Sequence, residues 1–488
     1  MKTLTRKLAG LSLSLLLLLA SQAFSQEKKT PGYGGSLRMG SHRDLDSLNP
    51  FFATQSETRR IRTLAYEPLI TTDDKFAYQP NLAVSWKISP NGLTYTFELR
   101  RGVKFHNGAE MTAEDVKWCL DYILEPKNVA YGRARLLSVT QVEAPASHTV
   151  RIHLKNASAP FLGFLTDIAV LLVVPKGSVP PGGAKLDAAP PGTGPFQLVS
   201  WQPRQRTVFR KFDQYWRKGI PYLDEILFDR VPDETTRFTA LRAGELDLIG
   251  RVPYSGVIGI KRKSIQGIQL AESPYSDFRR LIFNVKEGPF KDKRLRQAVA
   301  YALDKKNLIE GAYLGLGIAT NQKLVPGSPF FFNDLPDRSN NPEQAKKLLK
   351  EAGYEKGLKF TVIGRPGYED QLQMVQAQLR RVGIEVVIDI MDTATYDRRQ
   401  REMQFVVTPR GGQVSIEPDD IYYPDYHTET GEKRSSNFSG FSHPEVDRLL
   451  EEGRKILNQE ARKETYRKVM EIINEEMPEI NLAFISRF

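Results

Sequence analysis

Strand-like and helix-like patterns alternate irregularly along the chain from Gly35 onward, and this mixture constrains the fold more than any single motif does. Residues 94–100 alternate apolar and polar side chains, which predicts a half-buried strand. Apolar side chains recur at helical spacing in residues 112–124, and residues 372–382 and 384–390 predict a helix followed by a strand. The pattern predicts an α/β protein, and its 488 residues are enough for two or three lobes.

A stretch rich in proline, glycine and alanine between residues 175 and 195 is the best candidate for a boundary between lobes. The chain has one cysteine, Cys119, which excludes intrachain disulfides and multi-cysteine metal sites. Cys119 falls on the apolar face of the helix predicted for residues 112–124, so we expect a core residue rather than a reactive thiol.

The first 25 residues have the pattern of a secretory signal peptide. Lys2, Arg6 and Lys7 precede an apolar run of about 13 residues, which is shorter than the roughly 20 that a membrane-spanning helix needs. Small residues follow the run, as a cleavage site requires, and no cysteine lies there to carry a lipid anchor. We therefore expect a mature protein that is exported to the periplasm without a lipid anchor.

The formal net charge of +11 falls to +8 without these 25 residues, which carry three basic residues and no acidic one. The remaining basic residues form short, separate groups such as Arg100-Arg101 and Arg398-Arg399, without interleaved aromatic residues. Dispersed charge of this kind is typical of a solvated surface rather than of a phosphate track. The sequence therefore argues against a nucleic-acid partner.

A search for local chemical signatures finds no HExxH, CxxC, GxSxG or GxxxxGK motif. The six histidines never stand four residues apart, as a pair of metal ligands on one helix would. We predict no metal site, no cofactor and no catalytic residue. A catalytic triad assembled from distant segments stays open, because such a triad is recognised by geometry and not by spacing.

Two glycine-containing loops are the candidates for a binding function. The GTGPF segment at residues 192–196 precedes an aromatic-rich stretch, and it is either a ligand-contacting loop or a structural turn. Near residue 411, a glycine pair places bare backbone beside one guanidinium and several acids, which suits a ligand cleft, although a solvated loop is the alternative. The candidate ligand residues of this second loop are Arg410, Gly411, Gln413, Glu417 and Asp419.

Several blocks in fixed order closely resemble the bacterial extracellular solute-binding proteins of family 5, the receptors that supply ABC importers with peptides, nickel complexes and related solutes. The resemblance covers essentially all of the chain after the predicted signal peptide. The blocks are FHNG at 105–108, TAEDV at 112–116, GTGPF at 192–196, YW at 215–216, FKD at 290–292, RQA at 296–298 and PEVD at 444–447.

The resemblance implies a fold like that of type II periplasmic binding proteins, with two mixed α/β lobes hinged around the ligand and an extra domain in one lobe. We expect lobe I to comprise residues 33–67, 190–282 and 478–488, the extra domain residues 68–189, and lobe II residues 283–477. The resemblance also implies a monomeric, non-enzymatic receptor whose partners are a small-molecule or peptide-like solute and an inner-membrane ABC permease. An extracytoplasmic sensor subunit and a secreted hydrolase are the alternatives.

One block departs from the peptide receptors of this family, which carry a Trp and an amine-binding Asp before a [DE]-P dipeptide. Aligned on Glu417, the Trp position is Gly411 and the Asp position is Val414. Because the amine anchor is missing, the resemblance implies a non-peptide solute or a modified peptide, with an acidic group for Arg410. We also expect four further residues on the cleft side, namely Asp44, Tyr131, Thr193 and Trp201.

Overall fold

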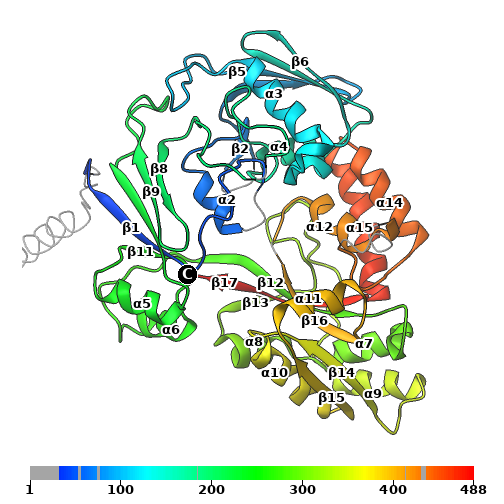
Figure 1. Cartoon of the computed structure of the whole chain (residues 1–488). Coiled ribbons are helices and arrows are strands. Elements are labelled where there is room, and N and C mark those ends of the chain that lie inside the picture. The colour runs from blue at the N-terminus through cyan, green and yellow to red at the C-terminus, as the bar shows by residue number, and fades with distance from the viewer. Residues whose placement is uncertain (1–31, 53–55, 74–76, 184, 413, 430–435) are drawn as a thin grey trace, which may run out of the picture.

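The computed structural model describes residues 32–52, 56–73, 77–183, 185–412, 414–429 and 436–488, so the signal peptide predicted for residues 1–25 lies outside the described residues. The molecule is a mixed α/β protein built from several sheets, which confirms the predicted class (Figure 1). The strand expected near residues 94–100 is β5 (Thr94–Leu99), and the helix expected near 112–124 is α3 (Ala113–Leu124). Within the described part of the chain, no helix combines the length and apolar character that crossing a membrane requires.

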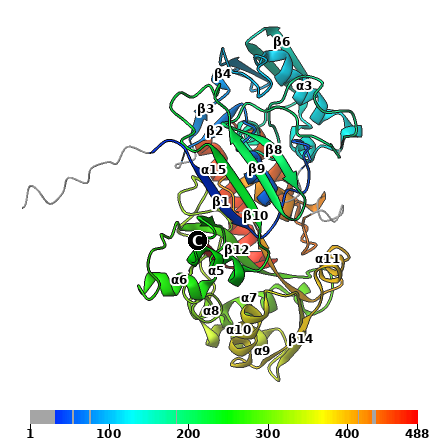
Figure 2. The ribbon, with the colours of Figure 1, turned by 60° about the vertical axis from the view of Figure 1, so that its left-hand side comes forward.

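The first lobe is built on a sheet with the strand order β11-β1-β10-β9-β8 (Figure 2). β1 pairs parallel with β10 and β11, whereas β9 pairs antiparallel with β8 and β10, so segments far apart in the sequence meet in one sheet. The strands are β1 Ser36–Ser41, β8 Phe196–Gln202, β9 Arg206–Lys211, β10 Glu225–Arg230 and β11 Leu248–Ile249, and the helices are α2 Ser56–Arg62, α5 Glu234–Arg242 and α6 Tyr254–Lys261.

The extra domain carries the antiparallel sheet β4-β5-β7-β6, against which α3 packs. Cys119 on α3 is buried, and burial raises the pKa of its thiol to about 12, which fits the predicted core role. One apolar core runs through this domain and the first lobe, from Leu45 through Phe97 to Ile226. The further elements are β2 Ile70–Thr72, β3 Tyr78–Pro80, β4 Ala83–Ile88, β6 Val139–Ala146, β7 Thr149–Leu154, α4 Phe161–Thr166, and the short 3-10 helices η1 Pro126–Asn128 and η2 Tyr131–Leu136.

The second lobe contains a sheet with the order β13-β17-β12-β16-β14-β15 and a separate apolar core. β14 pairs parallel with β15 and β16, and β12 pairs antiparallel with β16 and β17. The strands are β12 Ser273–Phe283, β13 Gly317–Ala319, β14 Leu358–Gly364, β15 Ile384–Ile390, β16 Val407–Gly412 and β17 Glu479–Arg487, and the helices are η3 Pro289–Lys291, α7 Lys293–Ala302, α8 Lys305–Tyr313, α9 Pro342–Glu351, α10 Glu369–Arg380 and α11 Thr393–Arg401.

Three helices beside this sheet form a further core of the second lobe, on the side that faces the extra domain (Figure 1). They are α12 (Pro418–Tyr426), α14 (Pro444–Lys455) and α15 (Gln459–Glu476), and α14 packs against both of the others. The last turn of α14 touches the extra domain, where the amide of Ala159 donates to the carbonyl of Arg454 at 2.8 Å. The extra domain therefore contacts both lobes.

β12 and β17 lie side by side across the middle of the molecule (Figure 1). The predicted boundaries place residues 478–488 and all of β12 except Phe283 in lobe I, and these boundaries stay predictions. β17 has β12 on one edge and β13 on the other, so its backbone groups find their partners within this sheet. The chain end contacts the first lobe, where the amide of Val252 donates to the carbonyl of Phe488 at 3.0 Å.

A buried network of four charges holds these two strands to α12. Arg280 on β12 lies 2.7 Å from both Asp425 and Glu479, and Lys323 lies 2.6 Å from Asp425 and 2.5 Å from Glu479. The side chain of Lys323 has no exposed surface, that of Glu479 is 4% exposed and that of Asp425 is 14% exposed. Two cations face two anions, so each buried charge is compensated, and removal of one partner leaves another without its counter-charge.

We expect Lys323→Met to lower the free energy of unfolding by about 3–5 kcal/mol, because two buried carboxylates would then share one guanidinium. Lys359→Met is the matched control, since its ion pair with Glu385 is more than half exposed and should contribute less than about 1 kcal/mol. Urea unfolding followed by circular dichroism measures both values. Equal losses for the two variants would contradict the importance of the network.

Candidate functional site

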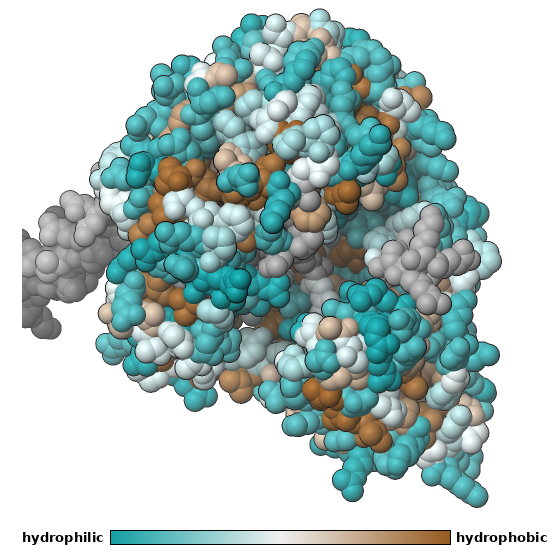
Figure 3. Space-filling model, viewed as in Figure 1, coloured by the Kyte–Doolittle hydropathy of each residue, from teal (hydrophilic) through white to brown (hydrophobic). Residues whose placement is uncertain are grey.

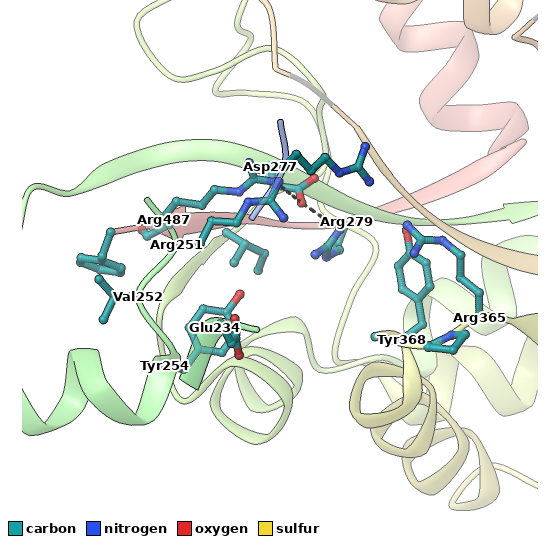
Figure 4. Close-up of a pocket in the computed structure, with 15 residues that line it drawn as sticks. Glu234, Arg251, Val252, Tyr254, Asp277, Arg279, Arg365, Tyr368 and Arg487 are labelled. Carbon is teal, nitrogen blue, oxygen red and sulfur yellow. Dashed lines mark hydrogen bonds and ion pairs between the residues drawn. The ribbon is translucent and has the colours of Figure 1, made fainter. Parts of the chain in front are cut away.

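A cavity of about 410 Å³ lies between the first lobe, the strands β12 and β17, and the loop from β14 to α10 (Figure 4). A volume of several hundred cubic ångströms is typical of a small-molecule site. Residues of both lobes contribute to the lining, so a molecule in the cavity would touch both. The charged lining residues are Arg43, Glu234, Arg251, Asp277, Arg279, Arg365 and Arg487.

Two parallel strands of the second lobe end at this cavity. β14 ends at Gly364, directly before Arg365, and the glycine pair closes β16 at Gly411 and Gly412. Ligands of open α/β sheets bind outside the carboxyl ends of the strands, where consecutive connections leave in different directions. The cavity therefore occupies the edge of the sheet at which a ligand site is expected.

Asp277 on β12 organises the charged groups of the cavity. Its Oδ2 atom lies 3.0 Å from Arg279 Nη1 and 3.2 Å from Arg487 Nη2, and its Oδ1 atom accepts from the amide of Gly412 at 3.2 Å. Burial lowers the pKa of Arg279, but Asp277 and nearby tyrosines outweigh this effect, so the pKa lies above its ordinary value. One carboxylate thus pairs with two guanidiniums.

Gly411 is required for this arrangement. A Cβ atom at this position would lie 2.2 Å from Nη1 of Arg279 and 3.0 Å from Oδ1 of Asp277, so any larger residue would displace the ion pair. The amide of Gly411 donates to the hydroxyl of Tyr368 at 2.8 Å. The space beside the backbone of Gly411 is therefore filled by Arg279 from the neighbouring strand.

Tyr368 forms an aromatic wall of the cavity and is itself 4% exposed. The guanidinium carbons of Arg279 and Arg365 lie 5.5 and 5.2 Å from the centre of its ring. In Figure 4 Arg279 lies between Asp277 on one side and Arg365 with Tyr368 on the other. Stacking on the ring restrains two cationic side chains that come from different elements.

A second cavity of about 420 Å³ lies beside the first, and both are lined by Arg251, Arg487 and Phe488. Its lining is more apolar and includes Met39 and Phe228 from the first-lobe sheet. The space-filling view shows the molecule hollowed between its upper and lower parts on one face (Figure 3). The two cavities form neighbouring compartments near the strands that join the lobes.

Arg410, the predicted partner of an acidic ligand group, does not line either cavity. Its Nη1 atom donates to Gln400 at 2.6 Å, and its guanidinium lies 4.0 Å from the centre of the Phe438 ring. Gln413, a second predicted ligand residue, lies outside the described residues. Val414 packs against the apolar cluster of Phe278, so the position of the family's amine-binding Asp is apolar here.

Glu417 and Asp419 lie at the start of α12 and are engaged with arginines of the neighbouring helices. Glu417 accepts from Arg462 Nη1 at 3.0 Å, and Asp419 lies 3.0 Å from Arg454. Burial raises the pKa of Asp419 to about 7 and that of its neighbour Asp420 to about 6, and the adjacent arginines offset only part of this effect. These acids line neither large cavity.

Asp44 and Trp201 contact each other, away from both cavity linings. The carboxylate of Asp44 accepts from Trp201 Nε1 at 3.1 Å, from the amide of Arg204 at 2.6 Å and from the hydroxyl of Thr207 at 3.3 Å. These donors belong to the β8–β9 hairpin. Asp44 thus anchors the hairpin to the segment that follows β1.

Thr193 is fully buried and donates its hydroxyl to Glu67 at 3.0 Å. Tyr215 and Trp216 donate to the same carboxylate at 2.9 Å each. A Cβ atom on Gly192 would lie 1.9 Å from the carbonyl oxygen of Ala65, so this loop needs glycine for close backbone packing. Of the two interpretations of the GTGPF loop, the contacts favour the structural turn.

Tyr131 is 47% exposed at the start of η2, and the guanidinium of Arg59 lies 5.2 Å from its ring centre. The same short helix carries Arg135, which lies 3.7 Å from Asp420 on α12. Tyr131 therefore belongs to the part of the extra domain that approaches the second lobe, but it lines neither large cavity.

The arginines of the cavity and Asp277 are not among the site residues predicted from the sequence. Arg279 lies within β12 and Arg365 directly follows β14, but nothing in the local sequence shows that their side chains converge. The signal that could have found them is the position of Arg365 just after a strand. In the described ranges, no group of three or more His, Cys, Asp and Glu side chains is arranged to hold a metal ion.

Comparison with known proteins agrees with this architecture. The family model described as "Bacterial extracellular solute-binding proteins, family 5 Middle" matches residues 77–433. The glutathione-binding protein GsiB of Salmonella choleraesuis is 29% identical over 451 residues, which cover 90% of this chain and 87% of the relative. Heme-binding protein A of Haemophilus influenzae is 31% identical over 435 residues, which cover 83% and 78% of the two chains.

Among solved structures, the binding protein AgaA from A. tumefacien R10 in complex with agropinic acid has a TM-score of 0.76 at 27% identity, covering 93% of this chain and 92% of that chain. The predicted fold of a type II periplasmic binding protein is thereby confirmed. The family match extends over most of the chain and includes the β14–α10 loop, which forms one side of the charged cavity. The chain belongs to the bacterial extracellular solute-binding proteins, family 5.

Proposed function

We propose that this protein is the periplasmic receptor of an ABC importer and that it holds its solute in the arginine-lined cavity between the lobes. The observation that carries the proposal is the lining itself, which combines Arg43 and Arg251 of the first lobe with Arg365 and Tyr368 of the second. A solute that touches both lobes stabilises the arrangement in which they are close together. The permease can then distinguish the loaded receptor by its closed shape.

The distribution of apolar cores supports a hinge between the lobes. The first lobe and the extra domain share one core, whereas the second lobe has its own. β12 and β17 connect these bodies. The contact between the extra domain and α12 includes a polar pair, Arg135 and Asp420. Small polar interfaces permit domain motion more readily than continuous apolar cores do.

The relatives do not define the solute, because their names state ligands as different as glutathione, heme, dipeptides and agropinic acid. The receptor has no chemical step to perform, and its task is to bind, enclose and release. A sensor subunit for a membrane signalling protein would close around its solute in the same way. The cavity therefore does not distinguish the two functions, and membership of the family is what favours the importer. A monomer suffices, since one chain supplies both walls of the cavity.

We expect the loaded receptor to be more compact than the empty one. Protein purified from its native host should have a smaller radius of gyration in small-angle X-ray scattering than the same protein after its solute is removed in guanidinium and it is refolded. Mass spectrometry of the released material shows whether a solute was present. Identical radii for a demonstrably loaded and an empty sample would contradict hinge closure.

We expect the stability of the protein to decrease as the pH rises from about 4 to 7. The folded pKa of Asp419 is raised to about 7 by burial, while the unfolded chain titrates near 3.8, so only the folded state holds the proton in this window. In the Asp419→Asn variant, the free energy of unfolding should decrease over this pH range by roughly 1–3 kcal/mol less than in the wild type. Urea unfolding at pH 4.5 and 7.5 measures the effect.

Asp334→Asn is the control for this pH experiment. Asp334 is exposed and its pKa is lowered by Arg467, so it titrates below the window in both states. The control should keep the pH dependence of the wild type. If Asp419→Asn keeps it too, Asp419 is not the group that titrates.

A further inference from the structure

The charged cavity contains more positive than negative charge. Five arginines face two acids, Asp277 and Glu234, which leaves a formal excess of three positive charges. Asp277 is already shared between Arg279 and Arg487, and Glu234 is exposed at the first turn of α5. A concentration of like charges in a partly enclosed space is unfavourable unless a counter-charge enters it.

Two of these arginines have no acidic partner among the described residues. Neither Arg43 nor Arg365 forms an ion pair there, and the guanidinium of Arg365 lies 5.2 Å from the ring centre of Tyr368. The Nε atom of Arg279 is buried and has no hydrogen-bond acceptor in the described part of the chain. The cavity therefore presents donors of Arg279 and Arg365 whose hydrogen-bonding capacity the protein itself does not use.

We propose that the cavity selects a small solute that carries at least two negative charges, on carboxylate or phosphate groups. This inference rests on the proposed function, in which the same cavity holds the transported solute. Planar guanidiniums bind such groups through paired hydrogen bonds, which are stronger than those between neutral partners. The solute binds with its oxygens accepting from Arg279 and Arg365 and neutralises the excess charge.

The lining also disfavours a ligand with a free amine. The carboxylate of Asp277 is engaged by two guanidiniums, which would repel an approaching ammonium group. Glu234 is the other acidic residue of the lining, and it faces five arginines. The engaged carboxylate and the excess of arginines thus favour the same class of solute.

The test measures binding of citrate and of inorganic pyrophosphate by isothermal titration calorimetry at low ionic strength. The two probes separate a preference for carboxylates from a preference for phosphates, and dialanine serves as the probe with a free amine. Arg365→Gln should weaken binding of the preferred anion by roughly tenfold to a hundredfold, because one charge-assisted contact is lost. Higher salt should also weaken it.

Arg279→Gln should have a similar effect, and Arg365→Gln keeps the test valid if the more buried variant fails to fold. Arg210→Gln is the matched control, since this side chain is 63% exposed on β9 and lies outside the cavity lining. Its affinity should equal that of the wild type. If neither anion binds the wild type more tightly than it binds Arg365→Gln, the inference is overturned.

Mass spectrometry of the solute released from natively purified protein gives an independent outcome. A solute with two or more negative charges supports the inference, and one with fewer overturns it. If such a weakly charged solute still reduces the radius of gyration, the receptor function stands and only the solute class is wrong. If no bound solute reduces it, the proposed function fails as well.

Discussion

The buried network of Arg280, Lys323, Asp425 and Glu479 fixes the strands on which the rest of the structure depends. It joins β12, β17 and α12, and every one of its charges has a counter-charge. Register transmits this constraint to the cavity, because Arg279 directly precedes Arg280 on β12, and Arg487 lies on β17, the strand that carries Glu479. A slip of β12 by one residue would turn Asp277 and Arg279 together to the opposite face of the sheet, away from the cavity.

The residues around the glycine pair of β16 depend on one another. Gly411 leaves room that the guanidinium of Arg279 occupies, and Asp277 holds that guanidinium in place. Val414 adds to an apolar cluster. The position of Arg279 in the cavity lining therefore depends on a neighbouring residue that carries no side chain.

Much of the architecture could be predicted from the sequence, because strand and helix periodicity and capping are local. β5, α3 and β15 lie close to where their patterns place them, and the capping box of Thr112 with Asp115 is present. The predicted ligand residues stay predictions, because the residues around a ligand come from segments that are distant in the sequence. Asp44 is predicted as a ligand residue and binds the β8–β9 hairpin in the structure, since a carboxylate is equally suited to hold backbone and indole donors.

The sequence by itself determined the α/β class and the family, because each depends on residue types in a fixed order. Only the tertiary structure decided which charges meet. Arg43, Arg279, Arg365 and Arg487 come from four segments that are far apart in the chain, and their convergence depends on the pairing of β12 with β17 and on the end of β14. Long-range pairing of this kind leaves no local pattern, since each arginine alone is indistinguishable from a solvated surface residue.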